Sequence, residues 1–195
     1  MTQLKETFNI GLEGHVRILG YENGETIELL NKRNAIHPEH ASIVLASALA
    51  NRSNDGSIYA MHFGTGGATI DSLGNITYAS ANTTGAADLH VPVYSEVVDD
   101  TNGAPTGNQM AVKHITGNLF SDVEIRAVIG TTEPTGQTAT SNVNSSNLNS
   151  TNFVFDEIGL KTNSGLLFSH IVFSPIEKAA NRIIEVIYTI RVTIM

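Results

Sequence analysis

The sequence contains no cysteine and no tryptophan. Without cysteine the chain can form no disulfide, no thiolate zinc site and no cysteine nucleophile. Aromatic residues are also few, with 5 tyrosines and 7 phenylalanines, and most of them fall within expected strands. Because sugar-binding sites usually offer exposed aromatic rings, this scarcity disfavours a carbohydrate site. Stability has to come from packing or from assembly.

Basic residues are scarce as well. Lysine and arginine total 11 against 19 aspartate and glutamate residues, which gives a formal net charge of −8. A chain of this charge repels phosphate backbones, so no nucleic-acid partner is expected. No window approaches the roughly 18 to 20 consecutive apolar residues of a membrane-spanning helix. The start, MTQLKETFNIGLEG, lacks the apolar core of a secretory signal, so we expect no membrane partner and synthesis in a cytoplasm.

Alternation of apolar and polar residues dominates the last part of the sequence, residues 153–195. In its final run, six apolar side chains fall on one side of an extended chain: Ile184, Val186, Tyr188, Ile190, Val192 and Ile194. A period of two over this length predicts a half-buried β-strand. Two shorter strands are predicted before it, separated by the turn Asn163-Ser164-Gly165. The second, residues 166–173, is expected to end at Pro175, which cannot donate to a β-ladder.

The first part of the chain predicts a β-hairpin and one helix. Asn23-Gly24 tolerates positive φ and joins two β-like runs, residues 15–19 and 25–30, while residues 31–34 form a polar connector. A helix is predicted over residues 38–51, because Pro38 suits the first helical position and an apolar stripe follows. The stripe consists of Ala41, Val44, Leu45, Ala48 and Leu49. Further strands are predicted over residues 58–63, 93–98, 109–115 and 122–129.

These patterns predict a mainly β fold: an antiparallel β-sandwich, jelly-roll-like, with one packed α-helix and long polar loops. The length suits a single domain, residues 1–195. Residues 68–92 form a long connection with at most a short strand around residues 76–78. Residues 131–152 contain almost no apolar side chain. Loops this long are usually functional or held by a partner.

Histidines offer little sign of a metal site. His37 and His40 lie three residues apart at the helix start, but neither H-E-x-x-H spacing nor an evident third ligand accompanies them. His37 is therefore predicted to cap the helix and His40 to be exposed. The other histidines are scattered, and a metal site assembled from distant strands stays open.

Other candidate chemistry is equally sparse. Gly64-Thr65-Gly66-Gly67 resembles a phosphate loop only in its glycines, because no Lys-Ser/Thr and no helix follow, and a tight turn is predicted instead. Asp156 and Glu157 are adjacent in a strand and face opposite ways, so they form no general acid/base couple by spacing. Lys178 is a candidate for a structural ion pair. We expect no enzymatic activity, no cofactor and no metal.

A family resemblance follows from longer patterns. The C-terminal part of the chain has the pattern FDEIGL, then a glycine, a strand, P-I-E-K and a long alternating strand. This pattern resembles the C-terminal part of small virion structural proteins of tailed bacteriophages. Three earlier segments resemble the same group: GLEGHVRIL, NKRNAIHPEHASIVLASALA and IYAMHFGTGG. The resemblance therefore spans most of the chain. It implies a non-enzymatic accessory protein of the tail, neck (collar) or baseplate, located in the virion and docked onto other virion proteins.

Two alternatives remain. One is a capsid decoration (cement) protein, and the other is a carbohydrate-binding module of a host-recognition appendage, to be tested at Tyr21, Tyr78 and Tyr94. A homo-oligomer is expected, and a trimer is plausible for such an appendage, although nothing in the sequence counts subunits. The candidate intersubunit contacts lie in the glycine-rich turn and the polar loops: Gly64, Thr65, Gly66, Gly67, Asn82, Thr138 and Asn147.

Overall fold

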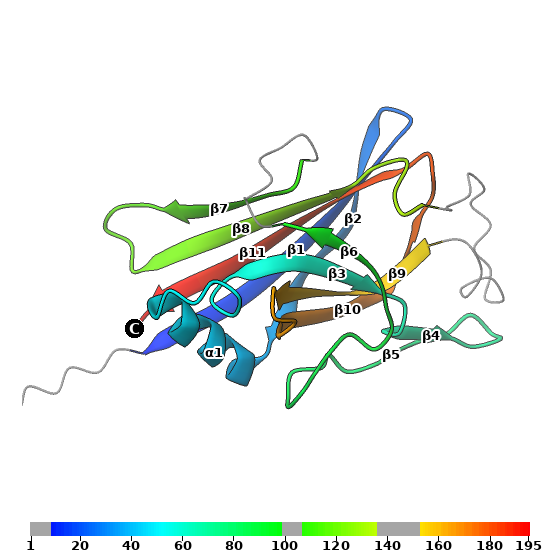
Figure 1. Ribbon diagram of the computed structural model, residues 1–195. Coiled ribbons are helices and arrows are strands. Elements are labelled where there is room, and N and C mark those ends of the chain that lie inside the picture. Colours follow the sequence, from blue (N-terminus) through cyan, green and yellow to red (C-terminus); the bar gives the residue numbers. More distant parts are fainter. Residues whose placement is uncertain (1–8, 99–106, 136–152) are drawn as a thin grey trace, which may run out of the picture.

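The computed structural model describes residues 9–98, 107–135 and 153–195. Its elements, in chain order, are β1 (Ile10–Glu22), β2 (Glu25–Ile36), α1 (Pro38–Leu49), β3 (Ile58–Gly64), β4 (Ala68–Ile70), β5 (Ile76–Tyr78), β6 (Pro92–Val97), β7 (Gln109–His114), β8 (Phe120–Ile129), β9 (Phe153–Thr162), β10 (Leu167–Lys178) and β11 (Ile183–Ile194). The predicted fold class is confirmed: the described chain is mainly β, antiparallel and sandwich-like, with one helix (Figure 1).

Nine of the strands form one curled sheet in the order β6-β3-β9-β10-β2-β1-β11-β8-β7, and all their pairings are antiparallel. Strand β2 lies where the two halves of this sheet meet, with β6-β3-β9-β10 on one side and β1-β11-β8-β7 on the other. Its earlier residues pair with β1, whereas Ala35 and Ile36 pair with β10. Strands that pass from one half to the other are a common way to turn the corner of a sandwich.

One hydrophobic core lies between the two halves of the sheet. The alternation predicted for the closing strand is confirmed for Ile184, Val186, Tyr188 and Ile190 of β11, which are buried. It is wrong for the end of the strand, where Val192 is half-buried and Ile194 is 39% exposed. From the other half, β3, β9 and β10 contribute to the same cluster through Phe63, Phe155, Ile158, Ile171 and Phe173. The Tyr188 hydroxyl donates to Ser169 Oγ at 2.8 Å, which joins β11 to β10 through the core.

Local turn and cap signals are also confirmed. Asn23 and Gly24 both have positive φ, 53° and 82°, as the tight β1–β2 hairpin requires. Pro38 occupies the first turn of α1, and His37 caps the helix by accepting the His40 N–H on its ring.

Four further boundary and burial predictions are wrong. Residues 31–34 were predicted as a polar connector, but they belong to strand β2, where Lys32 Nζ donates to Val172 O. Strand β10 continues past Pro175, because the register shifts between Val172 and Ile176 and the proline therefore needs no N–H for the β-ladder. The helix buries His40, Ala41, Val44 and Ser47 rather than the whole predicted stripe. His40 is buried because its Nδ1 lies 2.8 Å from Leu167 O, and Leu49 is 92% exposed.

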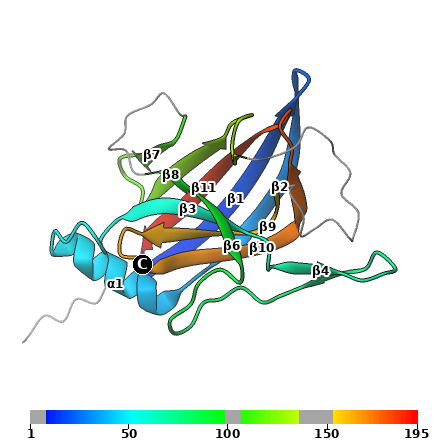
Figure 2. The same cartoon turned by 45° about the vertical axis from the view of Figure 1, so that its right-hand side comes forward.

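The long connection after β3 begins with a projecting hairpin, residues 68–78, here called the arm. The predicted short strand is β5, and β4, which pairs with it, was not predicted. Two views show the arm extending from the sheet on the side away from α1 (Figures 1 and 2). At the tip, Asp71 Oδ1 accepts the N–H groups of Leu73 and Asn75, which holds the turn in one conformation.

Candidate functional site

Two adjacent acidic side chains of β9 hold the base of the arm. Asp156 Oδ1 accepts the Gly67 N–H at 2.8 Å, and Asp156 Oδ2 accepts the Ala68 N–H at 3.1 Å. Both backbone groups lie where the glycine-rich turn enters β4. The carboxylate therefore satisfies donors that the short two-stranded hairpin leaves unpaired.

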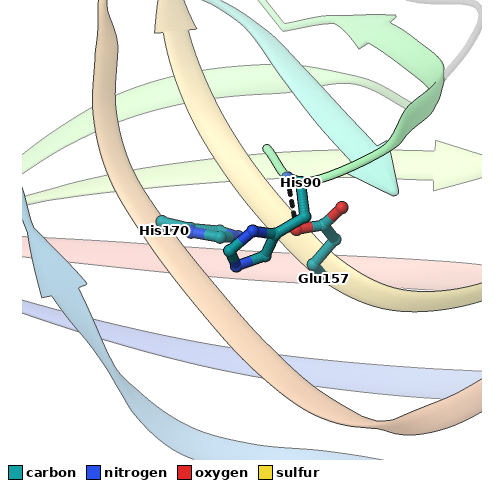
Figure 3. Close-up of side chains that lie close together, drawn as sticks. All are labelled: His90, Glu157 and His170. Carbon is teal, nitrogen blue, oxygen red and sulfur yellow. Dashed lines mark hydrogen bonds and ion pairs between the residues drawn. The ribbon is translucent and has the colours of Figure 1, made fainter. Parts of the chain in front are cut away.

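Glu157 is fully buried and accepts four hydrogen bonds. Its Oε1 takes the N–H groups of Gly66 and Val91, at 3.2 and 2.8 Å. Its Oε2 takes the His90 N–H at 2.9 Å and His170 Nε2 at 3.0 Å (Figure 3). One carboxylate thus joins three segments far apart in the sequence: the glycine-rich turn, the residues that lead into β6, and β10.

These environments move the two carboxyl pKa values in opposite directions. Burial raises the pKa of Asp156, and its bonds to Gly67 and Ala68 do not offset that effect. Burial also works to raise the pKa of Glu157, but the hydrogen bonds from His170, Val91, His90 and Gly66 more than offset it, so the pKa is lowered. Ionised Glu157 consequently stabilises the fold above its unfolded pKa, and this contribution is lost as the pH falls through its folded pKa.

The hydrogen bonds also assign the proton of each imidazole. His170 Nδ1 accepts the Asn82 N–H at 2.8 Å, so in the neutral ring the proton lies on Nε2 and is donated to Glu157. His90 Nε2 lies 2.9 Å from Ser80 O and donates to that carbonyl. Both histidines therefore have settled roles within the chain's own hydrogen-bond network.

His90, Glu157 and His170 are close enough to suggest a metal site, since one ligand atom from each lies within 4.8 Å of the others. The residues do not fit a metal. A neutral His170 bound through Nε2 would carry its proton on Nδ1, where the Asn82 N–H already points. Both oxygens of Glu157 are also occupied by protein donors. The cluster is a structural lock, called the Glu157 lock below.

The glycine-rich turn is a tight turn as predicted, and its N–H groups are directed at the chain's own carboxylates instead of a phosphate. Side chains would not fit there. A Cβ on Gly64 would lie 2.2 Å from Glu157 Oε1, and a Cβ on Gly67 would lie 2.7 Å from Asp156 O. Glycine is needed because backbone and carboxylate approach each other closely.

Gly67→Ala is expected to destabilise the chain by about 1–3 kcal/mol, because the new methyl group has to displace backbone or Val172. Urea unfolding measures the effect. Gly130→Ala is the matched control, since its Cβ would meet nothing closer than 3.4 Å. Equal midpoints for the two variants would contradict the close packing of the turn.

The predicted contact residues have the following places. Gly64 and Gly67 are buried, Thr65, Gly66 and Asn82 are half-buried, and Thr138 and Asn147 lie outside the described residues. Asn82 uses its side chain internally, donating from Nδ2 to Asp88 O at 2.7 Å. A role of these residues in intersubunit contact stays a prediction.

Sequence reasoning missed the Glu157 lock. It separated the two carboxylates by assuming strict alternation along β9, but the register shifts at Asp156, and both carboxylates accept from consecutive amides of the glycine-rich turn, Gly66 and Gly67. The donors come from residues 66–68 and 90–91, far from β9 in the sequence. Two adjacent acids inside a strongly apolar strand were the one available signal, because such charges are rarely buried without partners.

Comparisons with known proteins identify no relative. No family model, no curated protein and no solved structure matches the chain. Nor does the described part of the chain contain a helix that is long and apolar enough to cross a bilayer. Its function is therefore inferred from the sequence resemblance and from the geometry of the described residues.

Proposed function

We propose that the chain is a non-enzymatic structural component of a tailed-bacteriophage virion, an accessory protein of the tail, neck or baseplate that docks onto other virion proteins. The observation that supports a docking role is the arm, a hairpin that projects from the sheet (Figures 1 and 2). It carries exposed apolar side chains. Leu73 at its tip is 86% exposed, and Ile76 and Tyr78 are also exposed. Exposed apolar surface of this kind marks interaction sites.

The arm is ordered before any partner binds. Its turn is held by Asp71, its base by Asp156, and Ala79 N donates to Gly67 O across the two strands. The Tyr78 hydroxyl is also hydrogen-bonded to Ser174 Oγ of β10, at 2.6 Å. A preorganised element loses less conformational entropy on binding, which suits a permanent contact in an assembly.

The polar cluster favours a structural role over catalysis. Glu157 and His170 are both fully buried, and their polar atoms are already paired with protein groups. A general acid or base has to reach a substrate proton directly or through one water. Groups with this burial and pairing stabilise the loop above them.

The carbohydrate-binding alternative receives less support from the tyrosines proposed to test it. Tyr21 donates to Glu185 and Tyr94 donates to Glu96, and both rings are partly buried. Tyr78 is half exposed, but its hydroxyl is bonded to Ser174. Rings held in this way offer little free face on which a sugar could stack.

The decisive experiment is cryo-electron microscopy of purified particles produced by the genome that encodes the chain. Density for the chain at the tail, neck or baseplate would support the proposal. Density spread over the capsid lattice would make it a decoration protein instead. Absence of the chain from particles, checked by mass spectrometry, would overturn a virion role.

Leu73→Ser is expected to reduce the copy number in particles by at least about tenfold, as loss of a central apolar anchor does at other interfaces. Leu49→Ser is the matched control, since Leu49 is an equally exposed leucine on α1, away from the arm. Quantitative mass spectrometry of purified particles measures both. The isolated Leu73→Ser chain should fold normally, because the side chain makes no core contact; equal incorporation of the two variants would contradict docking through the arm.

A further inference from the structure

Three histidine rings hold the connection that returns from the arm to β6, residues 80–91. His170 Nδ1 accepts the Asn82 N–H at 2.8 Å, and His90 Nε2 lies 2.9 Å from Ser80 O. His37 Nε2 lies 3.1 Å from Gly85 O. These three contacts are of two kinds: His90 and His37 donate to carbonyls, whereas His170 accepts from a backbone N–H.

This difference makes His170 the acid-sensitive contact to a backbone amide of the connection, whereas His90 Nδ1 faces only the Asn82 side-chain Nδ2, at 3.5 Å. A protonated imidazole carries a hydrogen on both nitrogens and can accept no hydrogen bond. His90 and His37 would keep donating from Nε2 in the charged form. His170 cannot accept the Asn82 N–H once Nδ1 carries a proton, because two donors would then face each other at 2.8 Å.

We propose that protonation of His170 detaches the connection at Asn82 and loosens the return side of the arm, so that a proton gained at Nδ1 releases a docking element that the neutral ring holds. The biological meaning of this switch rests on the proposed docking function. The switch itself is a property of the isolated chain.

The surroundings of His170 determine which bond breaks. Protonation turns the Nε2–H bond to ionised Glu157 into an ion pair, so the ring stays with β9 while Asn82 leaves. The nearest other titratable group is His90 in the connection, whose ring centroid lies 5.4 Å from that of His170. The sheet contributes Asp156 of β9, His62 of β3 and Lys32 of β2, which is bonded to Val172 O. The Lys161–Asp88 ion pair lies beyond His62, and His37 and His40 lie at the start of α1. A second proton on His90 would repel His170 and act in the same direction.

His37 supplies an internal comparison. Its Nδ1 accepts the His40 N–H at 3.2 Å, so its protonation would disturb the first turn of α1. Its bond to Gly85 O would survive, because Nε2 donates in either state. The backbone amide of Asn82 therefore reports on His170, and the amide of His40 reports on His37.

The test is amide hydrogen exchange of the isolated full chain, followed residue by residue by NMR at about pH 7.5 and about pH 5.5, a range that spans histidine protonation. After correction for intrinsic exchange, protection of the Asn82 amide is expected to fall roughly tenfold at the lower pH, as expected for one lost hydrogen bond. Amides of the closing strand, such as Val186, should keep their protection.

Two variants separate the roles of the ring. His170→Asn places a carbonyl oxygen near the position of Nδ1 and cannot be protonated, so Asn82 should stay protected at both pH values. His170→Gln keeps a donor toward Glu157 without the Nδ1 acceptor, so Asn82 should exchange readily at both. A wild-type Asn82 amide equally protected at both pH values, or a His170→Asn variant that keeps the wild-type pH profile, would overturn the proposal.

A second measurement needs no variant. Ring nitrogen shifts of wild-type His170 should show protonated Nε2 and bare Nδ1 near neutral pH, with Nδ1 gaining its proton as the Asn82 amide loses protection. If the Asn82 amide loses protection while His170 Nδ1 gains no proton, the proposed switch is overturned. Because both measurements use the isolated chain, their failure leaves the virion role to be judged by the particle experiment.

Discussion

Glu157→Gln is expected to lower the free energy of unfolding by about 3 kcal/mol, more than any other conservative change of a polar side chain described above. Glutamine has the same shape, but its amide group presents two hydrogens where the carboxylate presents an oxygen. Whichever way the amide is turned, it faces N–H donors, either Gly66 and Val91 or His90 and His170. Buried donors left without an acceptor account for the loss.

Urea denaturation of wild type and variant measures this difference, and its pH dependence adds a second check. Because the pKa of Glu157 is lowered in the fold, the wild-type advantage is present above the unfolded pKa and fades as the pH falls through the folded pKa. The matched control is Glu28→Gln, an exposed carboxylate bonded to Arg17, for which little change is expected. A Glu157→Gln midpoint close to that of Glu28→Gln would contradict the Glu157 lock.

Lys178→Met is expected to stabilise the chain at neutral pH. Lys178 is fully buried in β10, and burial lowers its pKa from 10.5 to about 8, with Arg182 also acting to lower it and Glu133 acting to raise it. The unfolded chain therefore binds the proton more tightly than the fold does, and wild-type stability rises between about pH 8 and about pH 10.5. Converted to free energy, this pKa difference means that Lys178→Met raises the free energy of unfolding at pH 7 by at most about 3 kcal/mol. The polar contacts of the ammonium group, the bond from Nζ to Ala179 O among them, reduce this gain, because methionine cannot make them.

Thermal or urea unfolding from neutral to alkaline pH measures this effect. The difference between Lys178→Met and wild type should shrink as the pH rises toward the unfolded pKa of lysine. Lys113→Met is the control, because Lys113 is exposed on β7 and paired with Glu124, so its substitution removes no buried charge. A Lys178→Met variant less stable than wild type at every pH would show that the lysine's polar contacts outweigh the cost of burying its charge.

Much of the fold could be predicted because its signals are local. The alternation of β11 reports a strand with one face in the core, and Asn23-Gly24 reports the hairpin turn through a backbone conformation that few residues tolerate. Pro38 marks the helix start for a similar reason. These features depend on a few neighbouring residues, so a single sequence contains them.

The wrong predictions share a different cause. Residues 31–34 are polar, yet they extend β2 because β1 supplies the pairing partner. His40 is buried because β10 offers a carbonyl to its ring, and Pro175 lies inside β10 because the ladder shifts around it. In each case a neighbour distant in the sequence overrides the local preference.

By itself, the sequence determined the class of the fold, most of the strands, the hairpin turn and the start of the helix, since periodicity and backbone preference act over a few residues. The tertiary structure alone decided that Asp156 and Glu157 are buried together, that each accepts N–H groups from the turn at the base of the arm, and that His170 joins them with one fixed tautomer. Hydrogen bonds between residues so far apart leave no local pattern, because they depend on where the sheet brings its strands and loops together.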